Sequence, residues 1–363
     1  MELKMDTGKT YAIALEGGGA KGGYEIGAWR ALDEAGIKYN AVSGTSVGAL
    51  NGALMVMGDL EGAERAWKDM RLSKVIDVAP DEEQSLRKAL SGDIELSDVG
   101  GLISQAFDVI RNRGLDVAPL RRWVREVIDE KRVKASDIEL FVTTVSLTDR
   151  KALEIKVNDL PEDEICDMLL ASAYHPTFRL EKLGGKLYTD GGFVDTLPLH
   201  ALVANGYRDI IAIRIPGHGI ERRFKMPDDA SITVIDTDSD LGGVLYFDAE
   251  QSARDISIGY YDAKRVLYGL YGRQYYVDRT LGDREALGLL IDRLYDAQEH
   301  QSLRELLERE LPRMARRLDA ENGDYYELLI ALLESEAERL KIDRMRVITD
   351  AQLISEIDAA GKK

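Results

Sequence analysis

Cysteine is almost absent from the sequence: Cys166 is the one cysteine in 363 residues, so no disulfide can form within the chain. It lies in the apolar segment 165–170, which predicts a buried thiol in a protein of a reducing compartment. The N-terminus lacks the basic and apolar segments of a secretory signal, and no apolar run reaches the length of about 18 residues that a membrane span needs. We therefore expect a soluble, cytoplasmic protein.

Basic residues are also fewer than acidic ones. The chain carries 48 Lys and Arg against 65 Asp and Glu, which gives a net charge of −17. A surface this acidic repels phosphate backbones and anionic headgroups, so we expect no nucleic-acid partner and no strong electrostatic docking on an anionic membrane. A transient membrane contact through an apolar patch remains open. Because 45% of the residues are hydrophobic, the chain can form a large buried core.

The first 57 residues alternate between strand-like and helix-like segments. Residues 11–15 form a short apolar run that ends at a glycine cluster, and residues 22–35 repeat apolar side chains at near-helical spacing. Residues 41–43 predict a second strand, and residues 49–57 predict a buried helix. This alternation predicts an α/β fold with a parallel sheet.

More strands are expected after a mostly helical stretch from about residue 60 to residue 134. Their expected ranges are 138–147, 152–157, 186–189, 210–215 and 232–235, with a short helix at 165–173. The sequence therefore predicts that the sheet continues well beyond the first four elements.

The character of the chain changes beyond about residue 245, where Leu, Glu and Arg become frequent. Apolar spacing predicts two helices there, 283–318 and 324–342, with a kink at Pro312. We therefore expect a main domain at 1–240 and a helix-rich C-terminal region at 241–363, which could act as a lid, a cap or an interaction surface.

A Gly-x-Ser-x-Gly pattern occupies the junction between the second predicted strand and the helix after it. Ser46 is its centre, and Gly44 and Gly48 allow the close backbone approach that such a turn needs. The turn exposes the serine hydroxyl above the sheet, and the helix N-terminus favours developing negative charge. Ser46 is therefore predicted to be a nucleophile, the alternative being a helix-capping serine in a glycine-rich turn.

Acyl transfer also needs N–H donors for the oxyanion, and the glycines before the first predicted helix can supply them. The segment that begins at Gly17 reads Gly-Gly-Gly-Ala-Lys-Gly. We predict donors at Gly18 and Gly19, with help from the N–H of Val47, while Gly17 can serve the turn. Lys21 either adds positive potential near the site or only decorates the loop.

A serine nucleophile finally needs a base. Asp190 ends a short predicted strand, and Gly191 and Gly192 after it let a substrate or another backbone come close. A carboxylate that is partly desolvated there can accept the serine proton itself, because burial raises its pKa. Asp-Gly-Gly alone signals only a turn, so the prediction depends on all three elements together.

In this order and spacing, the three elements resemble those of the patatin-like phospholipases. The likeness covers about residues 11–215 and includes the shorter stretches 114–120 and 171–178. It implies a three-layer α/β/α fold with a mostly parallel sheet, and a Ser46–Asp190 dyad that hydrolyses acyl esters of lipids without a cofactor or a metal. The phospholipase A, lysophospholipase and esterase types all remain open. Seven residues support these motifs: Gly17, Lys21, Gly22, Gly44, Gly48, Gly191 and Gly192.

His175 departs from the family pattern, which usually has an apolar residue before the proline at this position. It lies 15 residues before Asp190 in the sequence. Two interpretations remain open: an auxiliary group that tunes the site or acts as an extra base, and a partly buried histidine whose ring is satisfied by a backbone group.

Three other interpretations of the motifs are open. The glycine segment also satisfies the dinucleotide-binding pattern, but no acidic residue stands at the end of the second predicted strand. An α/β-hydrolase triad could use His200, His218 or His300, but that fold normally has several strands before its nucleophile. A catalytically idle interaction protein would keep the same motifs without turnover.

Overall fold

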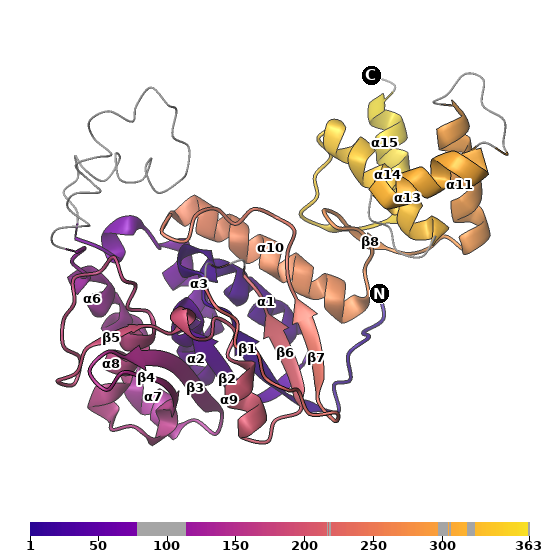
Figure 1. Ribbon diagram of the computed structural model, residues 1–363. Coiled ribbons are helices and arrows are strands. Elements are labelled where there is room, and N and C mark those ends of the chain that lie inside the picture. Colours follow the sequence, from indigo (N-terminus) through magenta and orange to yellow (C-terminus); the bar gives the residue numbers. More distant parts are fainter. Residues whose placement is uncertain are drawn as a thin grey trace. The chain divides into compact units, whose positions relative to one another are not determined.

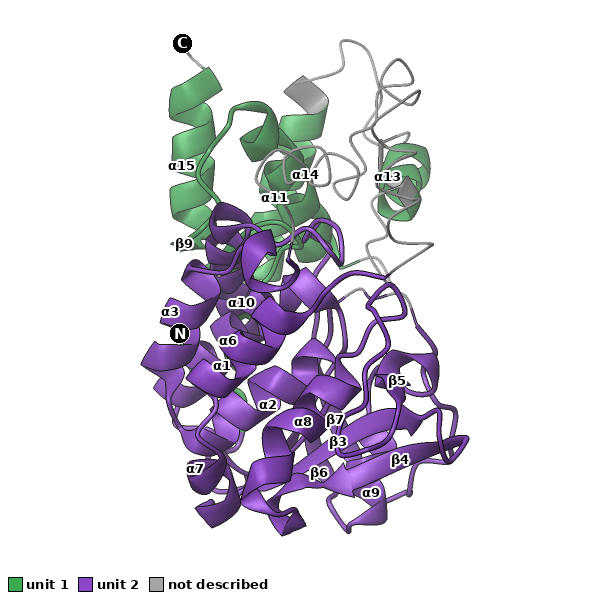
Figure 2. Ribbon diagram, turned by 90° about the vertical axis from the view of Figure 1, so that its left-hand side faces the viewer, with its two compact units in different colours: residues 1–5, 264–363 green, residues 6–263 purple. Residues whose placement is uncertain are grey.

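The structure, a computed structural model, describes residues 1–77, 114–215, 217, 219–296, 304, 306–317 and 324–361. The chain forms two compact units, one of residues 6–263 and one of residues 1–5 and 264–363 (Figure 2). The division falls within helix α10 (Ala249–Tyr268), so it lies later than the boundary after residue 240 that composition suggested.

Close packing between α10 and α1 (Gly23–Glu34) explains the later boundary. A Cβ atom at Gly27 of α1 would lie 1.9 Å from the carbonyl oxygen of Ile256. A Cβ atom at Gly259 would likewise lie 1.9 Å from the carbonyl oxygen of Tyr24. Two backbones can approach this closely only where both helices carry glycine, so the first part of α10 belongs to the larger unit.

A seven-stranded sheet forms the centre of the larger unit (Figure 1). The order along the sheet is β4–β3–β2–β1–β6–β7, and β5 pairs with β3. Pairing is parallel from β3 through β7, whereas β4 and β5 run antiparallel to β3. The strands are β1 (Thr10–Leu15), β2 (Lys38–Thr45), β3 (Glu139–Ser146), β4 (Lys151–Lys156), β5 (Tyr188–Asp190), β6 (Asp209–Ile213) and β7 (Ser231–Ile235).

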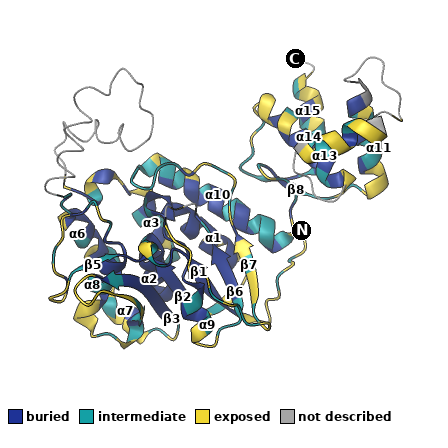
Figure 3. Ribbon diagram, viewed as in Figure 1, coloured by how far each residue is buried: buried dark blue, intermediate teal, exposed yellow. Residues whose placement is uncertain are grey.

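The central strands are buried on both faces, as the continuous apolar run 11–15 predicts. On one face, the side chains of Leu15 and Val42 lie against Gly52 of helix α2 (Val47–Met57). On the other face, Ala12 and Phe141 belong to a core cluster with residues of α9 (Leu199–Ala204). The edge strand β7 is largely exposed (Figure 3). Helices on both faces of a mostly parallel sheet make the three-layer α/β fold that the sequence predicts.

The remaining helices of this unit follow the predicted order. They are α3 (Leu60–Lys68), α6 (Ala118–Val127), α7 (Glu130–Ala135) and α8 (Glu162–Ser172), with short 3₁₀ turns η1 (Gly19–Gly22), η2 (Leu72–Lys74), η3 (Val157–Asp159) and η4 (Gly191–Phe193). Part of the expected helical stretch, residues 78–113, lies outside the described residues. Cys166 in α8 is buried with a free thiol, as expected.

The smaller unit has its own apolar core and a two-stranded sheet. Its elements are α11 (Asp283–Asp296), the π-helical turn η5 (Leu306–Glu310), α13 (Leu311–Arg317), α14 (Tyr325–Arg339), α15 (Asp350–Gly361), β8 (Tyr276–Asp278) and β9 (Val347–Thr349). Around Pro312 the described chain changes from the π-helical turn to α13, where the sequence predicted a kink. No helix among the described residues is long and apolar enough to cross a membrane.

Candidate active site

Ser46 occupies a strained turn between β2 and α2. Its φ of 56° and ψ of −122° place a non-glycine residue in a region that side chains rarely adopt. A Cβ atom at Gly44 would lie 2.2 Å from the carbonyl oxygen of Gly48, and one at Gly48 would lie 2.6 Å from that of Leu15. The two glycines of the motif are therefore needed to close the turn that presents the Ser46 side chain.

The Ser46 hydroxyl contacts Asp190 directly. Its Oγ donates a hydrogen bond of 2.6 Å to Oδ2 of Asp190, while the N–H of Gly192 donates to Oδ1 at 2.8 Å. Only 8% of Asp190 is exposed. Burial raises the pKa of this carboxyl to about 6, against the opposing effect of the two hydrogen bonds. At neutral pH the carboxylate form therefore prevails, and its basicity suits proton transfer.

The glycine-rich segment lies next to Ser46. A Cβ atom at Gly17 would lie 3.1 Å from the carbonyl oxygen of Thr45 and 3.2 Å from Cβ of Ser46, so the segment packs against the turn. The N–H of Gly17 donates to the carbonyl of Thr196 at 2.9 Å and is therefore engaged in the turn. Within the described residues, the N–H groups of Gly18 and Gly19 donate to no other residue. These two groups are available to an oxygen atom of a ligand.

Val47 adds a third N–H group at the first position of α2, where helical N–H groups have no partner within the helix. Gly18, Gly19, Val47 and Ser46 all line one cavity. Gly19 has a φ of +58°, and a Cβ atom there would lie 2.2 Å from the carbonyl oxygen of Val244. Any other residue at this position would displace the loop.

Gly22 and Gly191 allow close packing behind the residues that line the cavity, and Lys21 lies outside that lining. A Cβ atom at Gly22 would lie 2.5 Å from Cγ2 of Val47, and one at Gly191 would lie 2.2 Å from the carbonyl oxygen of Thr143. Lys21 does not line the cavity with Ser46. It is buried, so it does not decorate the surface of the loop, and burial lowers its pKa although nearby carboxylates act in the opposite direction.

The sequence did not show which residues hold the turn at Ser46. The N–H of Ser46 donates to Oγ of Ser172 at 2.9 Å, and that hydroxyl donates to the carbonyl of Thr143 at 2.6 Å. Thr45 Oγ1 donates to the carbonyl of Asp195 at 2.8 Å. Ser172, which is fully buried in α8, lies in the stretch 171–178 that resembles the family, but nothing in that stretch marked it as a hydrogen-bond partner of Ser46.

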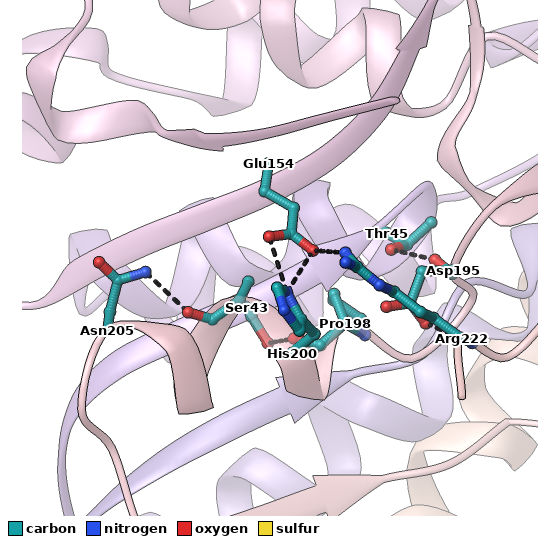
Figure 4. A network of polar contacts seen from close by, with 9 residues as sticks. Ser43, Thr45, Glu154, Asp195, Pro198, His200, Asn205 and Arg222 are labelled. Carbon is teal, nitrogen blue, oxygen red and sulfur yellow. Dashed lines mark hydrogen bonds and ion pairs between the residues drawn. The ribbon is translucent and has the colours of Figure 1, made fainter. Parts of the chain in front are cut away.

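A polar network joins His200, Glu154 and Arg222 near Asp195 (Figure 4). His200 Nδ1 lies 3.0 Å from both carboxylate oxygens of Glu154, and Arg222 donates to Oε1 of the same carboxylate at 2.7 Å. Since the Ser46 hydroxyl already bonds to Asp190, no histidine stands between the two. The geometry thus argues against a triad that uses His200, while His218 and His300 lie outside the described residues.

His175 lines the same cavity as Ser46. Its Nδ1 accepts a hydrogen bond from the N–H of Thr177 at 3.3 Å and lies 2.8 Å from the Thr177 hydroxyl. Burial lowers its pKa, so the ring is neutral at physiological pH. Within the described residues no hydrogen bond joins the ring to Ser46 or Asp190.

The cavity above Ser46 and Asp190 has a volume of about 280 Å³ and is mostly apolar. Its hydrophobic lining consists of Val47, Leu50, Trp67, Met70, Val75, Leu120, Trp123, Ala173, Phe178, Phe193, Val244, Leu245 and Phe247. An apolar space beside the Ser46–Asp190 pair suits a hydrocarbon group better than a charged one. Among the described residues, no group of three or more His, Cys, Asp or Glu side chains could hold a metal ion.

This fold and site define a class of α/β protein in which a serine in a strand-to-helix turn donates a hydrogen bond directly to an aspartate. A sequence model described as patatin-like phospholipase matches residues 13–203, which is more than half of the chain. The chain therefore belongs to the patatin-like phospholipase family. The resemblance inferred from the three motifs is confirmed, and membership of the family supports a lipid hydrolase.

Curated relatives share the same region. Human patatin-like phospholipase domain-containing protein 6 is 27% identical over 211 residues, which are 58% of this chain and 14% of that protein. The neuropathy target esterase sws of Drosophila melanogaster is 26% identical over 209 residues, 58% of this chain and 13% of that protein. The chain thus spans about a seventh of the length of these relatives.

A solved structure is also similar, though remotely. VipD from Legionella pneumophila aligns with a TM-score of 0.39 and 16% sequence identity, over 97% of this chain and 85% of that chain. A similarity this weak supports no inference about function.

Proposed function

We propose that the chain is a serine acyl hydrolase that cleaves carboxylic ester bonds of lipids, with Ser46 as nucleophile and Asp190 as base. The observation that carries the proposal is the 2.6 Å hydrogen bond from Ser46 Oγ to Asp190 Oδ2 at an apolar cavity. Membership of the patatin-like phospholipase family supports the same reaction class.

In the first step, Asp190 accepts the proton of Ser46 as Oγ attacks the ester carbonyl. The negative charge that develops on the carbonyl oxygen is stabilised by the N–H groups of Gly18, Gly19 and Val47. Each such donor typically lowers the activation barrier by about 2.7–4 kcal/mol. The ester C–O bond then breaks, the proton on Asp190 passes to the leaving alcohol, and an acyl-enzyme remains on Ser46.

In the second step, water attacks the acyl-enzyme. Asp190 removes a proton from the water, the same N–H groups stabilise the new oxyanion, and Ser46 Oγ leaves with the proton that Asp190 returns. The product is a free fatty acid. Asp190 suits both roles because its raised pKa lets it accept and release a proton near neutral pH.

The lining of the cavity supports an acyl chain as the group that it accepts. Phe193 lines the cavity and is 52% exposed, so an apolar side chain reaches from the site to solvent. This arrangement supports brief contact of the cavity mouth with a lipid aggregate, through an apolar surface rather than through charge. Phospholipids, lysophospholipids, monoacylglycerols and simple esters all present the required acyl ester.

The test measures the hydrolysis of p-nitrophenyl esters and of a dispersed lysophospholipid by the wild type, Ser46→Ala and Asp190→Asn. Each substitution should lower kcat by at least about 10³-fold, because the nucleophile or its base is lost. Ser355→Ala and Asp228→Asn are matched controls at exposed positions and should keep wild-type rates. Wild-type rates in Ser46→Ala would contradict the proposal, and so would no turnover of any ester by the folded wild type.

A further inference from the structure

A buried polar network lies behind the glycine-rich segment. The side-chain amide of Asn51 donates to the carbonyl of Gly22 at 2.9 Å and to Oε2 of Glu25 at 2.7 Å. Its carbonyl oxygen accepts a hydrogen bond of 2.8 Å from the indole N–H of Trp67. Asn51 and Glu25 have no exposed surface, and Trp67 is 1% exposed. One side chain therefore joins the glycine segment, a buried carboxyl and an indole ring.

This network holds the indole in one place. Breaking any of its hydrogen bonds would leave a buried polar group without a partner, at a typical cost of about 1–3 kcal/mol. Burial raises the pKa of Glu25 well above its ordinary value, against the opposing effect of the hydrogen bond from Asn51. Trp67 is thus fixed by the hydrogen bond that its indole N–H donates to Asn51.

The position that the indole occupies is close to the nucleophile. A Cβ atom at Gly22 would lie 2.6 Å from Cζ2 of Trp67 and 2.5 Å from Cγ2 of Val47, the residue after Ser46. The indole therefore packs against the glycine segment beside the nucleophile turn. Trp67 also lines the cavity that contains Ser46. The ring separates the polar network from the apolar space above the serine.

We propose that Trp67 is a specificity-determining residue of the acyl site, and that Asn51 is a positioning residue that holds its indole ring as a wall of the cavity. The inference rests on the proposed function and adds to it the group that limits acyl size. In a cavity of about 280 Å³, a large rigid ring restricts the acyl chain that fits. A smaller side chain at this position enlarges the cavity and favours longer acyl chains.

The experiment measures kcat/KM for p-nitrophenyl butyrate, octanoate, laurate and palmitate. Trp67→Leu should raise the ratio of a longer to a shorter ester by roughly tenfold or more, since one methylene in an apolar pocket is worth about 10–200-fold. Trp67→Phe removes the indole N–H with less loss of volume and should give a smaller shift in the same direction. If Trp67→Leu fails to fold, Trp67→Phe still tests the role of Trp67.

Trp29 provides the matched control. It is another buried indole, 2% exposed, in α1 of the same unit, and it does not line the cavity. Trp29→Phe should leave the order of the four esters unchanged. Asn51→Ala frees the indole and should shift the ester ratio in the direction of Trp67→Leu, which a mere loss of stability would not do.

The outcomes separate this inference from the proposed function. Activity of the wild type with an unchanged ester profile in folded Trp67→Leu and Trp67→Phe would overturn the role of Trp67 and leave Ser46 as nucleophile. An equal shift in Trp29→Phe would also overturn it. A folded wild type that hydrolyses none of the four esters would contradict the proposed function itself.

Discussion

Replacing Asp190 by Asn should stabilise the larger unit at pH 8 while it abolishes activity. The burial that suits Asp190 to the proposed role of base also penalises its charged form in the folded protein. A folded pKa of about 6 against an ordinary value of 3.8 corresponds to about 3 kcal/mol of stability lost once the carboxyl is ionised. Asparagine carries no charge and can still accept from the N–H of Gly192 and donate to Ser46.

The difference in the free energy of unfolding between Asp190→Asn and the wild type should depend on pH. Between pH 4 and pH 6 the folded state holds the Asp190 proton more tightly than the unfolded state does, so the stability of the wild type falls as pH rises. Above about pH 6 the carboxyl becomes ionised in the folded state as well, and the stability of the wild type stops falling. The advantage of Asp190→Asn over the wild type should therefore grow from well under 1 kcal/mol at pH 4 to about 3 kcal/mol at pH 8.

Urea unfolding followed by tryptophan fluorescence measures this difference. All three tryptophans, Trp29, Trp67 and Trp123, belong to residues 6–263, so their fluorescence reports on the unit that contains the site. Asp228→Asn, the same change at an exposed carboxylate, should show no such dependence. An Asp190→Asn advantage that stays constant between pH 4 and pH 8, or a less stable variant at pH 8, would refute the reasoning.

Four further outcomes are expected. The rate of ester hydrolysis, measured as kcat/KM, should rise with pH through about 6 and then level off, because Asp190 must be ionised to act as base. Gly44→Ala should lower Tm sharply or prevent folding because of its 2.2 Å clash, whereas Gly288→Ala, an open helical position in α11, should be neutral or stabilising by up to about 1 kcal/mol. Glu25→Gln should keep wild-type kcat/KM, since the amide oxygen can still accept the hydrogen bond from Asn51 and burial disfavours a charge at this position. His175→Gln should stay within a few-fold of the wild-type kcat, since in the described part of the chain its ring bonds to neither member of the pair.

Each of these outcomes can be contradicted. A pH profile that is flat between 5 and 8 would remove Asp190 as the base, and a fully stable Gly44→Ala would show that the turn can relax. Loss of activity in Glu25→Gln without loss of fold would show that the carboxyl itself is needed for activity. A 100-fold loss of kcat in His175→Gln would give this histidine a part in the reaction.

The nucleophile turn was readable from the sequence because its constraints are local. Gly44, Ser46 and Gly48 lie within five residues, and a glycine pattern between a strand and a helix has few structural solutions. The apolar runs of the central strands were readable for the same reason, because burial on both faces leaves continuous hydrophobic segments. The motif order then identified the family.

The partners of the site were not readable because they come from distant parts of the chain. Ser172 is 126 positions from Ser46, and no local pattern marks a serine in an apolar helix as its hydrogen-bond partner. Asn51 lies in the apolar helix α2 and Trp67 in the amphipathic helix α3, and in neither helix does a periodic pattern mark a buried hydrogen bond. Only the packing of α1, α2 and α3 brings these side chains together.

The smaller unit was the least predictable part. Strands β8 and β9 have three residues each, too few to show a period of two, and they pair across about 70 positions of the chain. The division between the units falls inside α10, so no change in composition marks it. Helical spacing did predict α11 and α14, where amphipathic faces are long enough to be seen.

The most direct test of the central claim is labelling of the folded protein with a fluorophosphonate, followed by intact mass measurement and peptide mapping. We predict one adduct, on Ser46, which is lost in Ser46→Ala and is strongly slowed in Asp190→Asn. No adduct on the folded wild type, or an adduct on another serine that persists in Ser46→Ala, would contradict the assignment of Ser46 as an activated nucleophile.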